Sequence, residues 1–190
     1  MTSTRRDFLK ASASTFGSAW IAAQWPAIVA AASAARTAQA AGAAFTHLSP
    51  DDARDLEAIA AQIIPTDDTP GAREAGVVYF IDAALGSFAA AQAGGLRDGL
   101  AALNAKVNAP ATRFAALDDP AQIALLKAEE KSPFFGKVRF LTLAGMFSLP
   151  SYGGNREDIG WKLLGFDHRH VWAPPFGYYD AQAGGSNGKS

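Results

Sequence analysis

The sequence contains no cysteine among its 190 residues. Iron–sulfur ligation and haem attachment through a C-x-x-C-H motif both require cysteine, so neither is available to this chain. A disulfide is excluded for the same reason, which leaves packing and partner contacts as the sources of stability. The sequence also lacks the G-x-G-x-x-G and G-x-x-x-x-G-K-[ST] loops that hold dinucleotides and phosphates.

Neither sign of charge is gathered into a cluster. The chain carries 17 basic and 18 acidic residues, and residues 1–40 hold four of the basic residues and one acidic residue. The remainder therefore has 13 basic and 17 acidic residues and a net charge of −4. Because binding to phosphate backbones needs a basic patch, nucleic acid is not expected as a partner.

The N-terminus does carry a motif, in residues 4–10, which read TRRDFLK. Paired arginines, an apolar pair and a lysine before an alanine-rich run are typical of a twin-arginine export signal. The signal residues are Arg5, Arg6, Phe8, Leu9 and Lys10. We predict a leader over residues 1–40, with Ala38 and Ala40 as the small residues of a cleavage site. A membrane anchor or a disordered alanine-rich tail is the alternative, although Pro26 and weak hydropathy disfavour a membrane span.

The twin-arginine translocase carries proteins that are already folded, usually because they have acquired a cofactor in the cytoplasm. The part of the sequence after the leader shows no recognisable means of holding a cofactor. A leader for folded export on such a chain indicates that the cofactor belongs to a partner.

The part after the leader is predicted to be helical. Ser49, followed by Pro50 and two aspartates, is a helix start, and apolar residues at helical spacing continue to Ile63 before Pro65 ends the helix. A proline and glycine loop follows, over residues 65–72. Further helices are expected over residues 75–92, 96–107, 121–131, 134–149 and 155–164.

Glycines are expected to punctuate these helices. Gly94-Gly95 separates the second helix from the third, and Gly165 ends the last one. No segment alternates convincingly with the period of a strand, so the fold class is all-α. We expect a small irregular domain of about six helices over residues 41–180, with an extended aromatic C-terminal tail, and a disordered end over residues 181–190.

Aromatic residues are concentrated toward the C-terminus, where 11 of the 20 lie between Phe134 and Tyr179. An irregular, proline-containing tail with several aromatics is hard to bury in so small a domain, and exposed aromatics with a polar rim mark interaction surfaces. The predicted partner-binding residues are Phe134, Phe135, Tyr152, Asn155, Arg156, Trp161, Phe166, Trp172, Phe176, Tyr178 and Tyr179. The alternative is that the tail folds back over the chain's own core.

Few residues offer catalytic or metal-binding chemistry. His168 and His170 form an H-x-H pair, but no third metal ligand is visible, so hydrogen-bonded or solvated histidines are the favoured interpretation. The adjacent Asp67 and Asp68 lie in a loop, where capping a turn or binding backbone amides is favoured over catalysis. No nucleophile with a neighbouring base is found. The sequence therefore predicts no catalytic residue and no metal site.

Two groups of segments together resemble a known family, the gluconate 2-dehydrogenase subunit 3 family. Its N-terminal signature resembles IIPTDDTPGA at 63–72, AGV at 75–77 and FID at 80–82. Its C-terminal signature resembles the chain from Phe134-Phe135 through SYGGNR at 151–156 to GWKLLGF at 160–166. The two signatures occur in the same order and at compatible separation, and with the leader the resemblance covers about residues 4–180.

The resemblance implies a small subunit of a membrane-associated, FAD-dependent dehydrogenase of sugars or sugar acids. In such complexes a large subunit similar to the glucose–methanol–choline oxidoreductases carries FAD, and a cytochrome c subunit passes electrons to the respiratory chain. The small subunit is thought to assist folding and export of the large subunit, which travels with it. No catalytic residue is carried over from the family.

The expectation is a noncatalytic periplasmic subunit without a cofactor of its own, held at the inner membrane through its complex. Its partners would be the large flavoprotein, the cytochrome c subunit and, during export, the translocase. A free-standing periplasmic metal-binding or structural helical protein is the alternative.

Overall fold

The computed structural model describes residues 41–108, 112–149 and 154–166, together with positions 23, 26, 27, 30, 37 and 38. Within these residues the chain forms six α-helices and no strands, which confirms the predicted all-α class. The helices are α3 (Pro50–Ile63), α4 (Val77–Leu85), α5 (Ala93–Asn104), α6 (Asp119–Glu129), α7 (Pro133–Phe147) and α8 (Ile159–Leu163). Short 3₁₀ turns occur at η1 (Ala90–Gln92), η2 (Phe114–Ala116) and η4 (Arg156–Asp158).

Three of the helices begin with a side-chain cap followed by proline in the first turn. The Ser49 hydroxyl accepts the Asp52 N–H at 3.1 Å at the start of α3. Asp118 and Ser132 cap α6 and α7 in the same way. Each cap satisfies a backbone N–H that has no partner inside its helix, which is why these starts were readable from the sequence.

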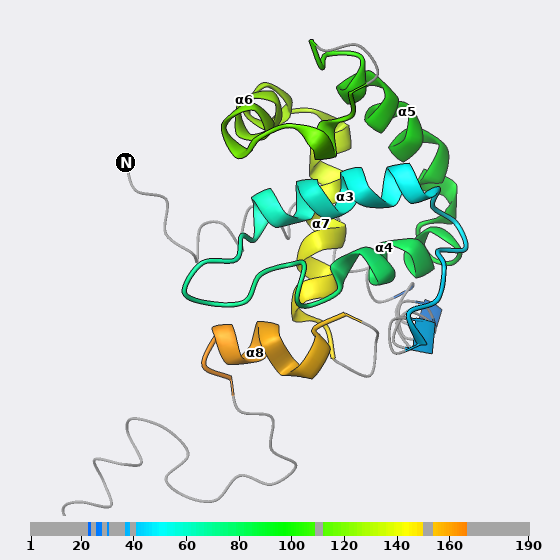
Figure 1. The fold of residues 1–190 in the computed structure, drawn as a ribbon. Helices are drawn as coiled ribbons and strands as arrows, with labels where there is room; N and C mark the ends of the chain where they lie inside the picture. Colours follow the sequence, from blue (N-terminus) through cyan, green and yellow to red (C-terminus); the bar gives the residue numbers. More distant parts are fainter. Residues whose placement is uncertain are drawn as a thin grey trace, which may run out of the picture.

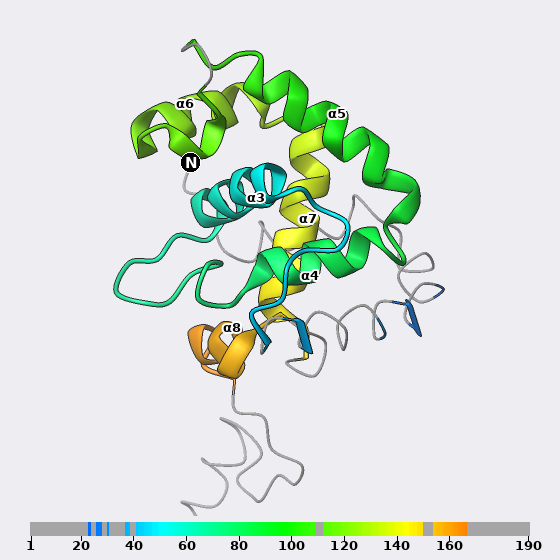
Figure 2. The same cartoon turned by 45° about the vertical axis from the view of Figure 1, so that its right-hand side comes forward.

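Helix α7 lies at the centre of the domain. In Figures 1 and 2, α3 and α4 cross it, α5 and α6 lie toward one of its ends, and α8 lies at the other. Each of the other described α-helices contacts it. The predicted apolar stripe of α3 is buried against this centre at Leu56, Ile59 and Ala60. Removing that surface from water is the main stabilising contribution to a domain of this size.

The helix predicted over residues 75–92 is wrong in its length. Helix α4 ends at Leu85, and the stretch Ala90–Asn104, which comprises η1 and α5, is bent by 94° relative to α4. The Ser87 hydroxyl donates to the Ala83 carbonyl at 2.8 Å, and the Gly86 N–H bonds Ala83 and Ala84 in a tightened last turn. Such local bonds compete with the next helical turn and end the helix.

The expected break at Gly94-Gly95 is also wrong, because both glycines lie in the first turn of α5. Glycine costs a helix least at its end, and α5 is held by the packing of Leu96, Leu100 and Leu103 in the core. Tertiary packing has therefore outweighed a weak local preference.

The last predicted helix, over residues 155–164, is divided. Asn155, Glu157 and Asp158 all have positive φ, so the chain makes the irregular turn η4 before α8 begins at Ile159. Gly165 ends α8 as predicted, with a φ of +67° that glycine adopts without steric cost.

None of the described helices is by itself long and apolar enough to cross a membrane. One bent pair, Val77–Leu85 with Ala90–Asn104, meets the requirement of length and composition only when the two are taken together.

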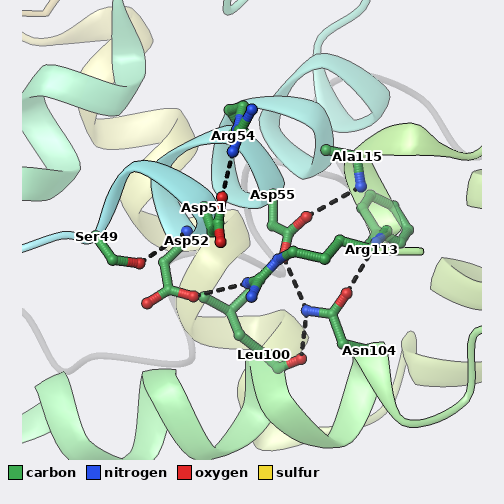
Figure 3. Close-up of polar contacts among 10 residues, drawn as sticks. Ser49, Asp51, Asp52, Arg54, Asp55, Leu100, Asn104, Arg113 and Ala115 are labelled. Atoms are coloured by element: carbon green, nitrogen blue, oxygen red, sulfur yellow. Dashed lines mark hydrogen bonds and ion pairs between the residues drawn. The ribbon is translucent and has the colours of Figure 1, made fainter. Parts of the chain in front are cut away.

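An ion pair between the fully buried Asp55 and the half-buried Arg113 joins three parts of the fold (Figure 3). The fully buried Asp55 carboxylate accepts hydrogen bonds from Arg113 Nη2 at 2.6 Å, Asn104 Nδ2 at 2.8 Å and the Ala115 N–H at 3.0 Å. Burial alone would lower the pKa of Arg113, but its hydrogen bonds to Asp55 and Asp52 and the charges of those residues raise it. Arg113 therefore stays charged, and the hydrogen bonds to Asp55 tie α3, α5 and η2 together.

Candidate partner-docking surface

The loop between α3 and α4, which carries most of the N-terminal signature, is closed on itself. The Ala72 N–H donates to the Ile64 carbonyl at 3.0 Å, so the loop returns to the point where it left α3. A Cβ on Gly71 would lie 2.5 Å from that carbonyl oxygen, which explains why glycine stands there. The exposed residues 65–70 are thereby held out from the domain.

Carboxylates hold the inside of this loop. Asp67 accepts the N–H and the hydroxyl of Thr69, both at 2.9 Å, which confirms the predicted binding of backbone amides. These hydrogen bonds, the backbone one first, lower the pKa of Asp67. Glu74 accepts the Thr66 hydroxyl and the Gly71 N–H, both at 2.8 Å. The bond from Thr66, with a smaller contribution from Gly71, lowers the pKa of Glu74.

The C-terminal signature forms a clamp around Asn155, which is fully buried. The Asn155 N–H donates to the Gly145 carbonyl at 2.7 Å and its Nδ2 donates to the Ser148 carbonyl at 3.0 Å. Its Oδ1 accepts the Gly160 N–H at 2.6 Å, in the first turn of α8, although the N-cap position of that helix is occupied by Asp158. One side chain therefore joins the end of α7 to the start of α8.

The clamp also brings the two signatures together in space. The Arg156 N–H donates to the Ala75 carbonyl at 3.3 Å, across the interval between the signatures. On the other side of α7, a Cβ on Gly145 would lie 3.2 Å from side-chain atoms of Val77 and Phe80. The two signatures noted in the sequence thus form one contiguous structural unit.

Next to the clamp, residues at the ends of α7 and α8 line an apolar groove. The Phe166 N–H bonds the Trp161 carbonyl at 2.8 Å and the Gly165 N–H bonds the Lys162 carbonyl at 3.0 Å, which is a Schellman motif. The Trp161 and Phe166 rings meet edge to face at 5.4 Å. The Trp161 Nε1–H donates to the Phe147 carbonyl at 3.1 Å and fixes the indole.

The groove has a volume of about 530 Å³. Its lining residues are Phe147, Leu149, Trp161, Leu164, Gly165 and Phe166. Leu164 is 55% exposed and Phe166 is 48% exposed, which makes them the two most exposed large apolar side chains in the part of the chain that the structure describes. A rigid apolar groove with exposed aromatic and aliphatic walls is a surface suited to another protein.

The structure separates the predicted partner-binding residues into two groups. Phe134 and Asn155 are buried inside the chain and build the domain, and the largely buried Trp161 reaches the surface as part of the groove wall. Phe134 packs over Gly99 of α5, where a Cβ would lie 2.2 Å from its ring. Phe135 is half-buried, and only Arg156 and Phe166 are exposed.

The remaining predicted residues lie outside the described residues. They are Tyr152, Trp172, Phe176, Tyr178 and Tyr179 of the partner-binding set, Arg5, Arg6, Phe8, Leu9 and Lys10 of the export signal, Ala40 of the cleavage site, and His168 and His170. The sequence did not predict Leu149 and Leu164 as groove residues, because the prediction rested on the concentration of aromatic residues and both of these side chains are aliphatic.

Over residues 41–108, 112–149 and 154–166, no group of three or more histidine, aspartate or glutamate side chains is placed to hold a metal ion. In the loop between α3 and α4, which we call the signature loop, the Asp67 and Glu74 carboxylates are occupied by hydrogen bonds within that loop.

The fold and this surface define a small helical domain with an apolar groove beside the clamp formed by Asn155 and its glycine neighbours. The family model described as gluconate 2-dehydrogenase subunit 3 matches residues 50–167, from the start of α3 to the residue after the groove. The chain therefore belongs to the gluconate 2-dehydrogenase subunit 3 family. The family's name is that of a subunit of a multi-subunit dehydrogenase, which is consistent with a small subunit of such a complex. No curated protein and no solved structure matches the chain.

Proposed function

We propose that this chain is the noncatalytic small subunit of a periplasmic, FAD-dependent dehydrogenase of sugars or sugar acids. In this proposal it assists the folding and stability of the large flavoprotein subunit and supplies the twin-arginine leader for both. The family match over residues 50–167 is the observation that carries the proposal. FAD belongs to the large subunit, and a cytochrome c subunit takes the electrons onward.

The groove supports the docking part of this proposal. A site for an apolar segment of the large subunit needs exposed apolar walls and a rigid frame, because ordering a flexible surface on binding costs free energy. Leu164 and Phe166 supply exposed walls. The Schellman motif and the bond from Trp161 to Phe147 supply the frame.

Co-expression tests the proposal. The chain would be produced with an affinity tag, alone and beside the large dehydrogenase subunit, then captured and run on size exclusion with flavin absorbance recorded. The expected result is co-elution of both chains in one yellow peak that reduces a dye on addition of an aldose or aldonate. A colourless monomer that leaves the large subunit behind would overturn it.

Export is tested separately in cells. Arg5→Lys with Arg6→Lys should leave both the small and the large subunit in the cytoplasm, because one leader serves the pair. Fractionation followed by a dye-reduction assay measures the outcome. Normal periplasmic dehydrogenase activity in that variant would overturn the shared-leader role while leaving the docking role to the co-elution experiment.

A further inference from the structure

The chain just before α3 is attached to α4 by one carboxylate. Asp82, only 7% exposed, accepts the Thr46 N–H on Oδ2 at 3.0 Å. Its Oδ1 accepts the His47 N–H at 2.8 Å and the Leu48 N–H at 2.9 Å. Three hydrogen bonds to one carboxylate therefore hold the backbone of residues 46–48 against α4. We call residues 45–48 the strap.

Side chains hold the strap at further points. The Phe45 ring lies 5.0 Å from the Tyr79 ring, and Leu48 is buried in the core. The His47 imidazole packs so closely on Gly86 that a Cβ there would lie 2.1 Å from Nε2. From α5, Arg97 Nη2 donates to the His47 carbonyl at 3.3 Å. The strap is thus part of the fold, although it belongs to no helix.

A helix-ending turn directly precedes the strap. The Ala43 N–H donates to the Ala38 carbonyl at 2.9 Å, and Gly42 has a φ of +59°, the arrangement that closes a helix C-terminus. Ala38 belongs to the predicted cleavage site, and only Ala44 lies between this turn and the strap. The predicted leader therefore meets the domain at the strap itself.

We propose that the strap fixes the point where the export leader leaves the domain, and that Asp82 holds the strap in place only once the domain has folded. We call this attachment of the strap the fastening. This inference rests on the leader role proposed above. Asp82 follows the strap by 34 to 36 residues, with α3 and the signature loop between them. The carboxylate is therefore in place only after α3 and α4 have packed. Before α3 and α4 have packed, the leader continues directly into unfolded chain, and the core site that buries Leu48 in the folded domain is empty.

Limited proteolysis tests the fastening. Asp82→Asn weakens the acceptor, and Asp51→Asn is its control, because Asp51 is exposed and pairs only with Arg54 among the described contacts. Gly86→Leu puts a side chain where His47 lies and leaves Asp82 intact. Gly94→Leu is its control, since a Cβ at that exposed α5 position meets nothing within 4 Å.

Chymotryptic cleavage after Phe45, identified by mass spectrometry, should become at least tenfold faster in Asp82→Asn and in Gly86→Leu. Both controls should match the wild-type chain, and the helical circular dichroism of all four variants should be retained. Cleavage after Phe45 at the same rate in both test variants as in the wild-type chain, whether that rate is slow or fast, would overturn the fastening.

Export of the same four variants then tests its link to the leader. With Arg5 and Arg6 intact, the exported fraction of the two test variants should fall several-fold below that of the controls. Unchanged export together with faster cleavage would overturn the link. If Arg5→Lys with Arg6→Lys leaves export unchanged, the leader role fails and the link with it, while the rate of cleavage after Phe45 still decides the fastening.

Discussion

Gly154 lies directly against Gly145 of α7, so closely that a Cβ on Gly154 would stand 1.8 Å from the Gly145 carbonyl oxygen. That same oxygen accepts the Asn155 N–H at 2.7 Å. The backbone of the chain entering α8 therefore packs directly on the backbone of α7, and no side chain fits between them. The groove below depends on this contact, because it sets where Trp161 and Phe166 lie relative to Phe147.

Gly154→Ala should lower the free energy of unfolding by about 1–3 kcal/mol, the usual cost of forcing extra atoms into a packed site. Gly136→Ala is the matched control, since Gly136 lies within α7 and its Cβ would meet nothing within 4 Å. Alanine is the better helix former, so the control should be stabilised by about 0.5–1 kcal/mol. Urea denaturation of both variants measures the two changes, and equal stability of the two would contradict the packing described.

Asn155 has a φ of +48° and also carries two side-chain hydrogen bonds, and substitutions separate these roles. Asn155→Ala loses the hydrogen bonds and strains the backbone, whereas Asn155→Gly loses only the bonds. Alanine should therefore be the more destabilising by about 1–2 kcal/mol, the cost of a left-handed residue with a Cβ. Thermal denaturation of the pair checks this, and a glycine variant no more stable than the alanine variant would refute it.

The sequence predicted those features that a few neighbouring residues determine. The cap at Ser49, the start at Pro133 and the end at Gly165 all depend on local hydrogen bonds and local sterics. The burial of Asn155 and Trp161 could not be predicted, because it arises from the approach of Gly154 to Gly145. Counting aromatics identified Phe166 but gave no means of telling an exposed ring from a buried one.

Asp55→Ala should lower the free energy of unfolding by about 1–3 kcal/mol, since it leaves the Asn104 and Ala115 donors without their buried acceptor, whereas the half-buried Arg113 keeps Asp52 as a partner. Asp51→Ala is the control, because it removes an exposed pair with Arg54, a type of pair that contributes at most about 1 kcal/mol. Urea denaturation again gives the comparison. If Asp55→Ala lowers the free energy of unfolding by less than about 1 kcal/mol, the described hydrogen bonds to the Asp55 carboxylate are contradicted.

The signature loop should loosen in acid. The pKa values of Asp67 and Glu74 are lowered by folding from their ordinary 3.8 and 4.5, so both carboxylates stabilise the folded loop above about pH 4.5. This contribution is lost as the pH falls through the lower, folded-state pKa values. The amide NMR shifts of Thr69 and Gly71 should follow that titration, and Glu74→Gln should remove the Gly71 transition alone. A Gly71 midpoint at or above pH 4.5 would contradict the hydrogen bonding described.

In the proposed complex, the groove at the end of α8 docks the large dehydrogenase subunit. Leu164→Asp places a charge in the groove, and Ile123→Asp places one on another exposed apolar side chain, 39% exposed on α6 toward the other end of α7 (Figures 1 and 2). Binding of each purified variant to the large subunit would be measured by titration. We expect at least tenfold weaker binding for Leu164→Asp, which is a loss of about 1.4 kcal/mol of binding free energy, and wild-type binding for Ile123→Asp. Wild-type affinity in Leu164→Asp would contradict the proposed docking.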